Sequence, residues 1–163
     1  MLTHPVGPSM SAPLILRRAE PEDSGDLLAW RNDPESVRNS KSPTPVALGE
    51  HARWFAASLT NPDRRIYIGL VGDEKIGMVR FDRLARSEPA YLVSITINPA
   101  CRGRRLGTRL LLAALRQAAP ATFDAEIRTE NVISQRLFEA CGFRRVGPSA
   151  DIVLDLYRAA VPE

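Results

Sequence analysis

Apolar and polar residues alternate along several stretches of this chain, and elsewhere the apolar residues recur with the spacing of a helix. Alternation predicts strands that are buried on one face, whereas helical spacing predicts amphipathic helices. The predicted strands cover residues 14–18, 65–71, 75–81, 91–97, 123–128, 144–146 and 152–157. The predicted helices cover residues 21–30, 46–59 and 132–140, a stretch around 110–115, and a short turn at 35–39. The order β-α-α-β-β-β-α-β-α-β-β indicates a single α/β domain with a mixed sheet.

The composition suits one domain with an apolar core, because 44% of the 163 residues are hydrophobic. No run of 18 apolar residues occurs, so we expect no contact with a membrane. Residues 1–13 lack the basic and apolar regions of a signal peptide; we expect a loose tail, with Met10 as a candidate start. Cys101 and Cys141 lack metal-ligand spacing, so we expect reduced thiols, a cytoplasmic location and no metal.

The net charge of +3 favours an anionic ligand. Of the 22 basic residues only Lys41 and Lys75 are lysines, and the arginines are scattered among 19 acidic residues. A nucleic-acid-binding protein would gather its basic residues on one face, together with aromatic residues. Only residues 102–109 concentrate arginine here, so we expect a small anionic ligand and no nucleic-acid partner.

Residues 102–108, Arg-Gly-Arg-Arg-Leu-Gly-Thr, connect the strand that ends at Ile97 with a leucine-rich helix. The first backbone N–H groups of a helix have no intrahelical acceptor, and the helix dipole is positive at that end. Small residues let an anion approach the backbone, and Arg102, Arg104 and Arg105 add positive charge. The loop therefore predicts a cradle for a pyrophosphate.

This loop resembles the signature Gln/Arg-x-x-Gly-x-Gly/Ala of the GCN5-related N-acetyltransferase (GNAT) superfamily, which holds the pyrophosphate of coenzyme A. Arg102 and Gly107 match its first and last positions, and Arg105 stands where the first glycine is usual. If this position needs a positive φ, an arginine there costs roughly 1–2 kcal/mol. If it needs only an accessible backbone N–H, an arginine there costs little. The resemblance covers residues 14–158 and leaves 159–163 as a C-terminal end. It implies a mostly antiparallel central sheet flanked by helices.

A second segment, from Asn131 to Phe143, is similar to the closing pattern of the same superfamily, Asn-x-x-Ala/Ser-x-x-Leu/Phe-Tyr-x-x-x-Gly-Phe. From the residues alone, Asn131 is also a good helix N-cap, and Gly142 is a good residue to end that helix. The resemblance implies that acetyl-CoA binds to this segment, to the loop and to the preceding strand. The contacts that it implies are Ile95, Ile97, Arg102, Gly103, Arg104, Arg105, Leu106, Gly107, Thr108, Asn131, Ser134 and Phe138.

The N-terminal half resembles the branch that acetylates amino groups of nucleotide-linked sugars, as in pseudaminic and legionaminic acid synthesis. The similar motifs are Trp30-Arg31-Asn32 and His51-x-x-Trp54-Phe55. The acceptor contacts that the resemblance implies are Arg31, Asn32, His51, Trp54 and Arg80. Trp-Arg-Asn also occurs in branches that acetylate protein N-termini. The alternatives are therefore a protein N-terminal or small-amine acetyltransferase and a non-catalytic acetyl-CoA-binding module.

The acceptor residues also have purely structural alternatives. The spacing of Trp30 and Trp54 suits the core side of helices, and His51 suits a solvated helix position. Arg80 and Asp82 lie close enough in one strand to pair with each other.

The implied reaction is attack of a neutral primary amine on the acetyl thioester, with a backbone N–H near Ile97 donating to the developing oxyanion. The amine arrives as an ammonium ion, so a base has to remove a proton. The candidate bases are Glu126, Glu88, Asp82 and His51.

Many members of the superfamily protonate the leaving thiolate with a tyrosine at the position of Phe138, and phenylalanine has no proton to donate. Tyr91, Ser134 or water then has to serve. The expected partner is a small-molecule amine, and the sequence leaves the assembly open, with a homodimer as one candidate.

Overall fold

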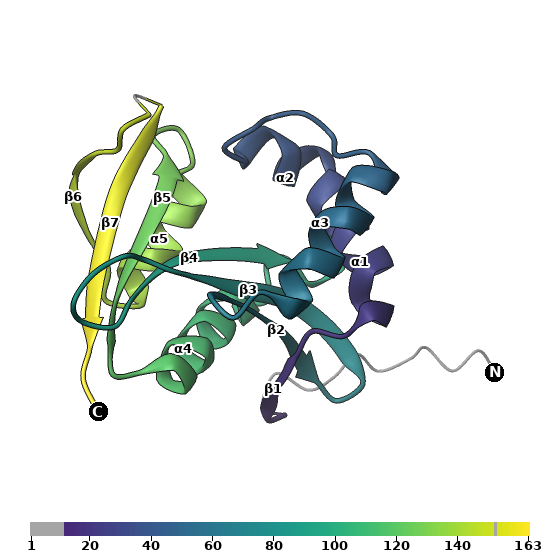
Figure 1. Ribbon diagram of the computed structural model, residues 1–163, viewed down its shortest axis with the longest axis horizontal. Coiled ribbons are helices and arrows are strands. Elements are labelled where there is room, and N and C mark those ends of the chain that lie inside the picture. The colour runs from purple at the N-terminus through teal and green to yellow at the C-terminus, as the bar shows by residue number, and fades with distance from the viewer. Residues whose placement is uncertain (1–11, 152) are drawn as a thin grey trace.

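The computed structural model describes residues 12–151 and 153–163. A seven-stranded sheet with the order β1-β2-β3-β4-β5-β7-β6 forms its centre (Figure 1). The strands are β1 (Leu14–Arg18), β2 (Arg64–Val71), β3 (Glu74–Arg83), β4 (Ala90–Ile97), β5 (Ala121–Arg128), β6 (Arg144–Pro148) and β7 (Leu154–Val161). The helices are α1 (Ser24–Asn32), α2 (Pro34–Asn39), α3 (Leu48–Thr60), α4 (Leu106–Ala118) and α5 (Val132–Ala140). All neighbouring strands except β4 and β5 are antiparallel, which confirms the predicted fold class.

Every predicted strand and helix is present, although several ends differ. β7 ends at Val161 rather than at residue 157, because Ala159 is buried and pairs with Phe123 of β5. A short 3₁₀ helix, Pro99–Cys101, lies outside the predicted elements. The expected start of the last strand, Ile152, and residues 1–11 of the expected tail lie outside the described residues. In the described part of the chain, no helix is long and apolar enough to cross a membrane.

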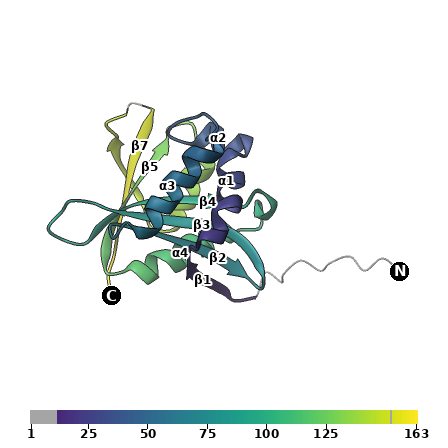
Figure 2. The ribbon, with the colours of Figure 1, turned by 45° about the vertical axis from the view of Figure 1, so that its right-hand side comes forward.

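Helices cover both faces of the sheet (Figure 2). On one face, Val79 of β3 belongs to a core that includes Leu110 of α4 and Phe138 of α5. On the other face, Met78 of β3 packs in a second cluster with Trp30 of α1. Met78 and Val79 are consecutive, so the alternation of side chains along β3 is what divides the molecule into two cores.

The two central strands separate before they end. The parallel pairing of β4 with β5 covers only Ala90–Leu92 and Thr122–Asp124. β4 stays paired with β3 as far as Ile97, and β5 stays paired with β7 as far as Arg128. The sheet is therefore split at the carboxyl ends of β4 and β5, which is where ligands bind in many α/β sheets.

A buried carboxylate joins β1, the start of α1 and β3. Asp23 is 1% exposed, accepts hydrogen bonds from Arg17 at 2.7 and 2.8 Å, and lies 2.9 Å from Nζ of Lys75. The hydrogen bonds from Arg17 and Lys75 hold the pKa of Asp23 far below its usual range, although burial acts in the opposite direction. The fold therefore stabilises the charged form of this side chain.

We expect Asp23→Asn to lower the free energy of unfolding at neutral pH by about 2–4 kcal/mol, because Arg17 and Lys75 lose their shared partner. In the wild type the folded-state pKa of Asp23 is lowered, so its contribution is complete above the unfolded-state pKa of about 3.9. The contribution is lost as the pH falls from there towards the folded-state pKa. Urea unfolding as a function of pH measures both effects.

Asp26→Asn is the matched control for this prediction. Asp26 is half exposed and lies 2.8 Å from the same Lys75 ammonium, so its loss should cost about 0.5 kcal/mol. Equal losses in the two variants would show that the buried ion pairs of Asp23 contribute no more to the stability of the fold than the exposed pair of Asp26 does.

Candidate functional site

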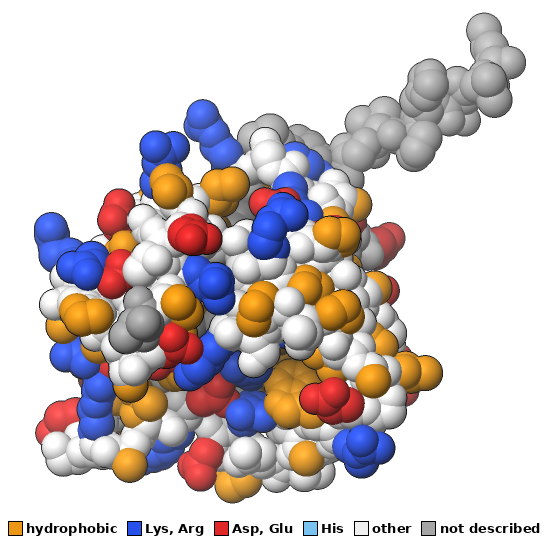
Figure 3. All heavy atoms as spheres, turned by 90° about the horizontal axis from the view of Figure 1, so that it is seen from above, with side chains coloured by type: hydrophobic (Ala, Val, Ile, Leu, Met, Phe, Trp, Pro, Cys, Tyr) orange, Lys and Arg blue, Asp and Glu red, His pale blue; other side chains and the backbone are white. Residues whose placement is uncertain are grey.

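A cavity of about 680 Å³ lies where β4 and β5 separate. Both strands line it, α5 borders it on one side, and α1, α2, α3 and the segment between α2 and α3 border it on the other. Figure 3 shows the face at the top of Figure 1, where side chains of both charges surround a hollow that contains apolar side chains. In the cavity, the edge of β4 that faces away from β3 offers backbone groups without a strand partner.

The loop between β4 and α4 has the backbone geometry of an anion-binding turn. Gly103 and Arg105 have φ values of 74° and 57°, and Arg105 is the only non-glycine residue in the described chain with a positive φ. Arg105 is also the N-cap of α4 and makes no side-chain cap, so the first N–H groups of α4 are left for a ligand. These residues fit a pyrophosphate. Arg105 therefore has the positive φ of the first alternative that the sequence left open, at a cost of roughly 1–2 kcal/mol.

Two of the three loop arginines are engaged by acidic residues. Arg102 contacts Asp33 at 2.7 Å and Glu35 at 3.1 Å, and its hydrogen bond lowers the pKa of Asp33. Arg104 contacts Glu74 at 3.2 Å. The side chain of Arg102 therefore joins the loop to α2, and the loop presents mainly backbone amides to an anion.

Gly107 has a packing role that was not predicted from the sequence. A Cβ atom at this position would lie 2.6 Å from Cδ1 of Leu137 in α5. Gly107 is buried, and of residues 102–108 only Arg102 lines the cavity. A bulky residue at 107 would therefore disturb the contact between α4 and α5 as well as the approach of an anion.

The predicted acetyl-CoA contacts on β4 and α5 all line the cavity: Ile95, Ile97, Asn131, Ser134 and Phe138. Asn131 also caps α5, since its Oδ1 accepts the N–H of Ser134 at 3.1 Å and its Nδ2 donates to Oγ of Ser134 at 2.9 Å. The structural alternative for Asn131 is thus correct, and the same residue still faces the cavity.

The structure brings Glu126 and Ser134 to the cavity but not Tyr91. Tyr91 lies at the paired start of β4, is 7% exposed, and accepts a hydrogen bond from Arg65 at 2.8 Å. Six residues of strand, or roughly 20 Å, separate it from Ile97 at the open end. Tyr91 is therefore placed as a core residue, because the aromatic cluster of the sheet encloses its ring.

Two of the four candidate bases line the cavity. The carboxylate of Glu126 accepts a hydrogen bond from Nζ of Lys41 at 3.3 Å. His51 is 4% exposed, and burial lowers its pKa, so the imidazole is neutral at pH 7. Asp82 and Glu88 do not line the cavity.

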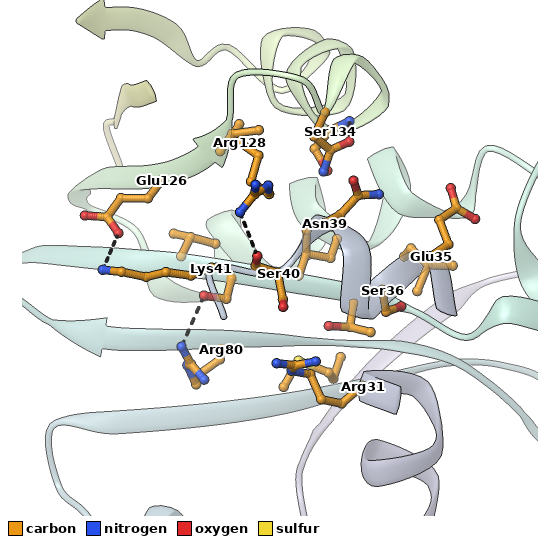
Figure 4. A pocket seen from close by; sticks show the side chains of 18 of the residues that line it. Arg31, Glu35, Ser36, Asn39, Ser40, Lys41, Arg80, Glu126, Arg128 and Ser134 are labelled. Atoms are coloured by element: carbon orange, nitrogen blue, oxygen red, sulfur yellow. Dashed lines mark hydrogen bonds and ion pairs between the residues drawn. The ribbon is translucent and has the colours of Figure 1, made fainter. Parts of the chain in front are cut away.

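Arg31 reaches the cavity from α1 (Figure 4). Its Nη2 atom donates to the carbonyl oxygen of Ser42 at 2.9 Å. Its Nη1 atom is buried and has no hydrogen-bond partner among the described residues, and burial lowers the pKa of the guanidinium. A buried donor without a partner costs about 1–3 kcal/mol unless a ligand accepts from it.

His51 and Trp54 of α3 line the same cavity as Arg31. The ring of His51 stacks on Phe55 with 5.8 Å between centroids, so the solvated alternative for His51 is wrong. Trp54 is half-buried, and the guanidinium carbons of Arg64 and Arg80 lie 5.5 and 5.6 Å from its ring centroid. Trp54 therefore packs against the second core cluster and also lines the cavity, with two cations near its ring.

The remaining two predicted acceptor residues differ in position. Arg80 lines the cavity and donates to Asp82 at 2.8 Å, so the predicted pair is confirmed. Asn32 does not line the cavity, because its side-chain amide exchanges two 2.8 Å hydrogen bonds with the backbone of Val46. Asn32 thus holds the segment between α2 and α3 in place.

Several polar residues that line the cavity were not predicted from the sequence: Glu35, Lys41, Glu50, Ser94, Thr96 and Arg128. Ser94 could have been found, because it is opposite Arg80 in the register of β3 and β4 and its Oγ accepts a hydrogen bond from that side chain at 3.3 Å. Lys41 follows α2 in a segment without periodicity, so no sequence signal points to it.

The fold is that of coenzyme-A-dependent acetyltransferases. Aminoglycoside acetyltransferase AAC(6')-Ib in complex with coenzyme A has a TM-score of 0.78 at 17% identity, over 91% of this chain and 95% of that one. Spermidine N-acetyltransferase from Vibrio cholerae in complex with CoA and spermine has a TM-score of 0.77 at 18% identity, over 89% and 92%. Identities this low establish the fold alone.

The sequence profile of the acetyltransferase (GNAT) domain matches residues 13–144. The chain therefore belongs to the GNAT acetyltransferase family. N-alpha-acetyltransferase RimI of Mycobacterium tuberculosis is 34% identical over 95 residues, which are 57% of this chain and 60% of that protein. The match thus spans less than two thirds of this relative.

We expect Arg105→Gly to raise the free energy of unfolding by about 0.5–1 kcal/mol, because relief of the left-handed strain exceeds the added flexibility of the unfolded chain. Arg104→Gly is the control: it removes the contact with Glu74 at a residue without positive φ and should destabilise the protein. Urea unfolding of the two variants and the wild type measures both changes. A lower free energy of unfolding in Arg105→Gly would show that the left-handed conformation of Arg105 is not strained.

Proposed function

We propose that this protein transfers the acetyl group of acetyl-CoA to the primary amine of a nucleotide-linked amino sugar. Family membership supports acetyl transfer from this donor, and the neighbouring structures contain coenzyme A. The left-handed residues Gly103 and Arg105 and the start of α4 offer amides to a pyrophosphate, and the split between β4 and β5 leaves room for an extended ligand. Acetyl-CoA supplies an activated acetyl group, and the protein has to bind, orient and deprotonate the acceptor.

The observation that carries the choice of acceptor is the buried Nη1 atom of Arg31, which has no partner among the described residues. Five basic residues line the cavity against three acidic ones: Arg31, Lys41, Arg80, Arg102 and Arg128 against Glu35, Glu50 and Glu126. Lys41, Arg80 and Arg102 form ion pairs with acidic residues, whereas Arg31 and Arg128 donate to backbone carbonyl oxygens. This balance favours a phosphate-bearing acceptor over a polycation. A guanidinium suits a phosphate because its planar fork donates two charge-assisted hydrogen bonds.

Glu126 is the group that we propose to accept the proton of the acceptor ammonium. It already holds a primary ammonium, that of Lys41, at 3.3 Å. His51 is the alternative, because burial lowers its pKa and keeps it neutral. Backbone N–H groups at the open edge of β4, near Ile97, would donate to the developing oxyanion. Ser134 or water would protonate the leaving thiolate, since Phe138 has no proton to donate.

A protein N-terminal amine is the second candidate acceptor. The 34% identity with RimI over 95 residues favours it. A peptide acceptor would leave the Nη1 atom of Arg31 to a peptide carbonyl, which is a weaker partner than a phosphate. A third possibility, binding of acetyl-CoA without turnover, rests on the absence of a tyrosine at position 138.

A substrate panel read out by released free thiol separates these candidates. The panel contains uridine-diphosphate-linked amino sugars, the same amino sugars without the nucleotide, N-terminal peptides, spermidine and an aminoglycoside. We expect turnover with the nucleotide-linked amino sugars alone. Turnover with peptides alone would establish the second candidate. Calorimetric binding of acetyl-CoA without turnover of any amine would establish the third.

We expect Arg31→Ala to raise the KM for the acceptor by about ten- to a hundred-fold, because a charge-assisted hydrogen bond contributes roughly 1.5–3 kcal/mol. The affinity for acetyl-CoA, measured by calorimetry, should not change. Arg38→Ala is the matched control, since Arg38 is an exposed arginine of α2 that does not line the cavity. An unchanged KM in Arg31→Ala would remove this residue from the acceptor site.

A further inference from the structure

Residues Ser40–Ser42, between α2 and α3, lie against the cavity (Figure 4). Charged side chains that line the cavity hold this segment in place. Arg31 donates to the carbonyl oxygen of Ser42 at 2.9 Å, and Arg128 donates to that of Ser40 at 3.4 Å. Lys41 extends along the cavity to Glu126 of β5, 85 residues away in the sequence. The segment thus carries a primary amine into the space that an acceptor amine has to enter.

The amine of Lys41 has the chemistry of an acceptor. It is a primary amine on a flexible stem, it is paired with the carboxylate that we propose as the base, and its side chain is 65% exposed. The chain has only one other lysine, Lys75, whose ammonium contacts Asp23 and Asp26 and which does not line the cavity. Lys41 therefore differs from Lys75 in two ways: it lines the cavity, and it is paired with the proposed base.

We propose that Lys41 is a site of self-acetylation and acts as an internal acceptor when no external amine is bound. The proposal rests on the proposed function. Lys41 first loses a proton to Glu126, and its neutral Nζ then attacks the carbonyl carbon of the acetyl thioester. A C–N bond forms, the C–S bond breaks, and coenzyme A leaves as a thiolate that takes up a proton. The sum is Lys41–NH₃⁺ plus acetyl-CoA giving acetyl-Lys41, free CoA and one proton.

Acetylation would change the cavity in two ways. The positive charge of Lys41 disappears, so Glu126 loses its cationic partner, keeps the hydrogen bond from Oγ of Ser149, and can hold the ammonium of an external acceptor. The Ser40–Ser42 segment also loses one of its charged contacts, while those from Arg31 and Arg128 persist. When acetyl-CoA binds and no acceptor is present, self-acetylation therefore removes one positive charge from the acceptor site.

The test is peptide mass spectrometry of the full chain after incubation with acetyl-CoA and no added amine. Cleavage after acidic residues places Lys41 and Lys75 on different peptides. We expect Lys41 to be acetylated at least about ten-fold faster than Lys75, because the cavity holds its amine close to the donor. Heat-unfolded protein gives the rate of the uncatalysed reaction, at which the two lysines should be equal. The rate for Lys41 should be first order and independent of protein concentration.

Two variants test the chemistry. Glu126→Gln should slow acetylation of Lys41 by about a hundred-fold, which is the usual contribution of a general base. Lys75→Arg is the matched control and should leave acetylation of Lys41 unchanged. Calorimetry with acetyl-CoA shows that each variant is folded and binds the donor, and Lys41→Arg should bind it with wild-type affinity.

The outcomes distinguish this proposal from the proposed function. Binding of acetyl-CoA and turnover of an external amine, with Lys41 acetylated no faster than Lys75, would overturn self-acetylation and leave the enzyme intact; Lys41 would then be only an ion-pair partner of Glu126. A rate that rises with protein concentration would also overturn it, since the reaction would then occur between molecules. Absence of acetyl-CoA binding would overturn the proposed function itself.

Discussion

The separation of β4 from β5 beyond Leu92 and Asp124 is the constraint on which the site depends. In a continuous sheet, β5 would occupy the edge of β4 over Val93–Ile97, and no ligand could lie between the strands. The split leaves that edge accessible and opens the cavity. Both strands remain ordered because β3 and β7 still pair with their outer edges.

Polar contacts hold the connection between α2 and α3 against this cavity. Asn32 holds Val46, Arg31 holds Ser42, and Lys41 reaches across to Glu126. Segments held by exposed or partly buried polar contacts open at low free energy compared with a packed core. The rigid part of the site is therefore the split sheet, and the adaptable part is the connection between α2 and α3.

The loop before α4 combines strain with charge compensation. Arg105 adopts a left-handed conformation that glycine would adopt without strain, and such strain persists where the surrounding structure holds it at a binding site. Arg102 is meanwhile paired with Glu35 of α2, and Arg104 is paired with Glu74 of β3. The loop thus offers mainly backbone amides as donors, and Arg102 links it to α2.

Local patterns in the sequence determined the strands and helices, their order and the loop between β4 and α4. These features depend on residues that are close in the chain, so periodicity and turn residues are sufficient to predict them. The acetyl-CoA signature also needed no tertiary information, because it is one contiguous stretch. Even so, the sequence alone left the φ angle at Arg105 undecided.

Only the tertiary structure decided which predicted residues meet. It placed Tyr91 at the paired start of β4, away from Glu126 and Ser134, because the point at which β4 and β5 part cannot be read from either strand alone. It buried His51 against Phe55 and brought Lys41 to Glu126 across 85 residues of sequence. Contacts between distant segments depend on how the helices pack on the sheet, and no local pattern records that packing.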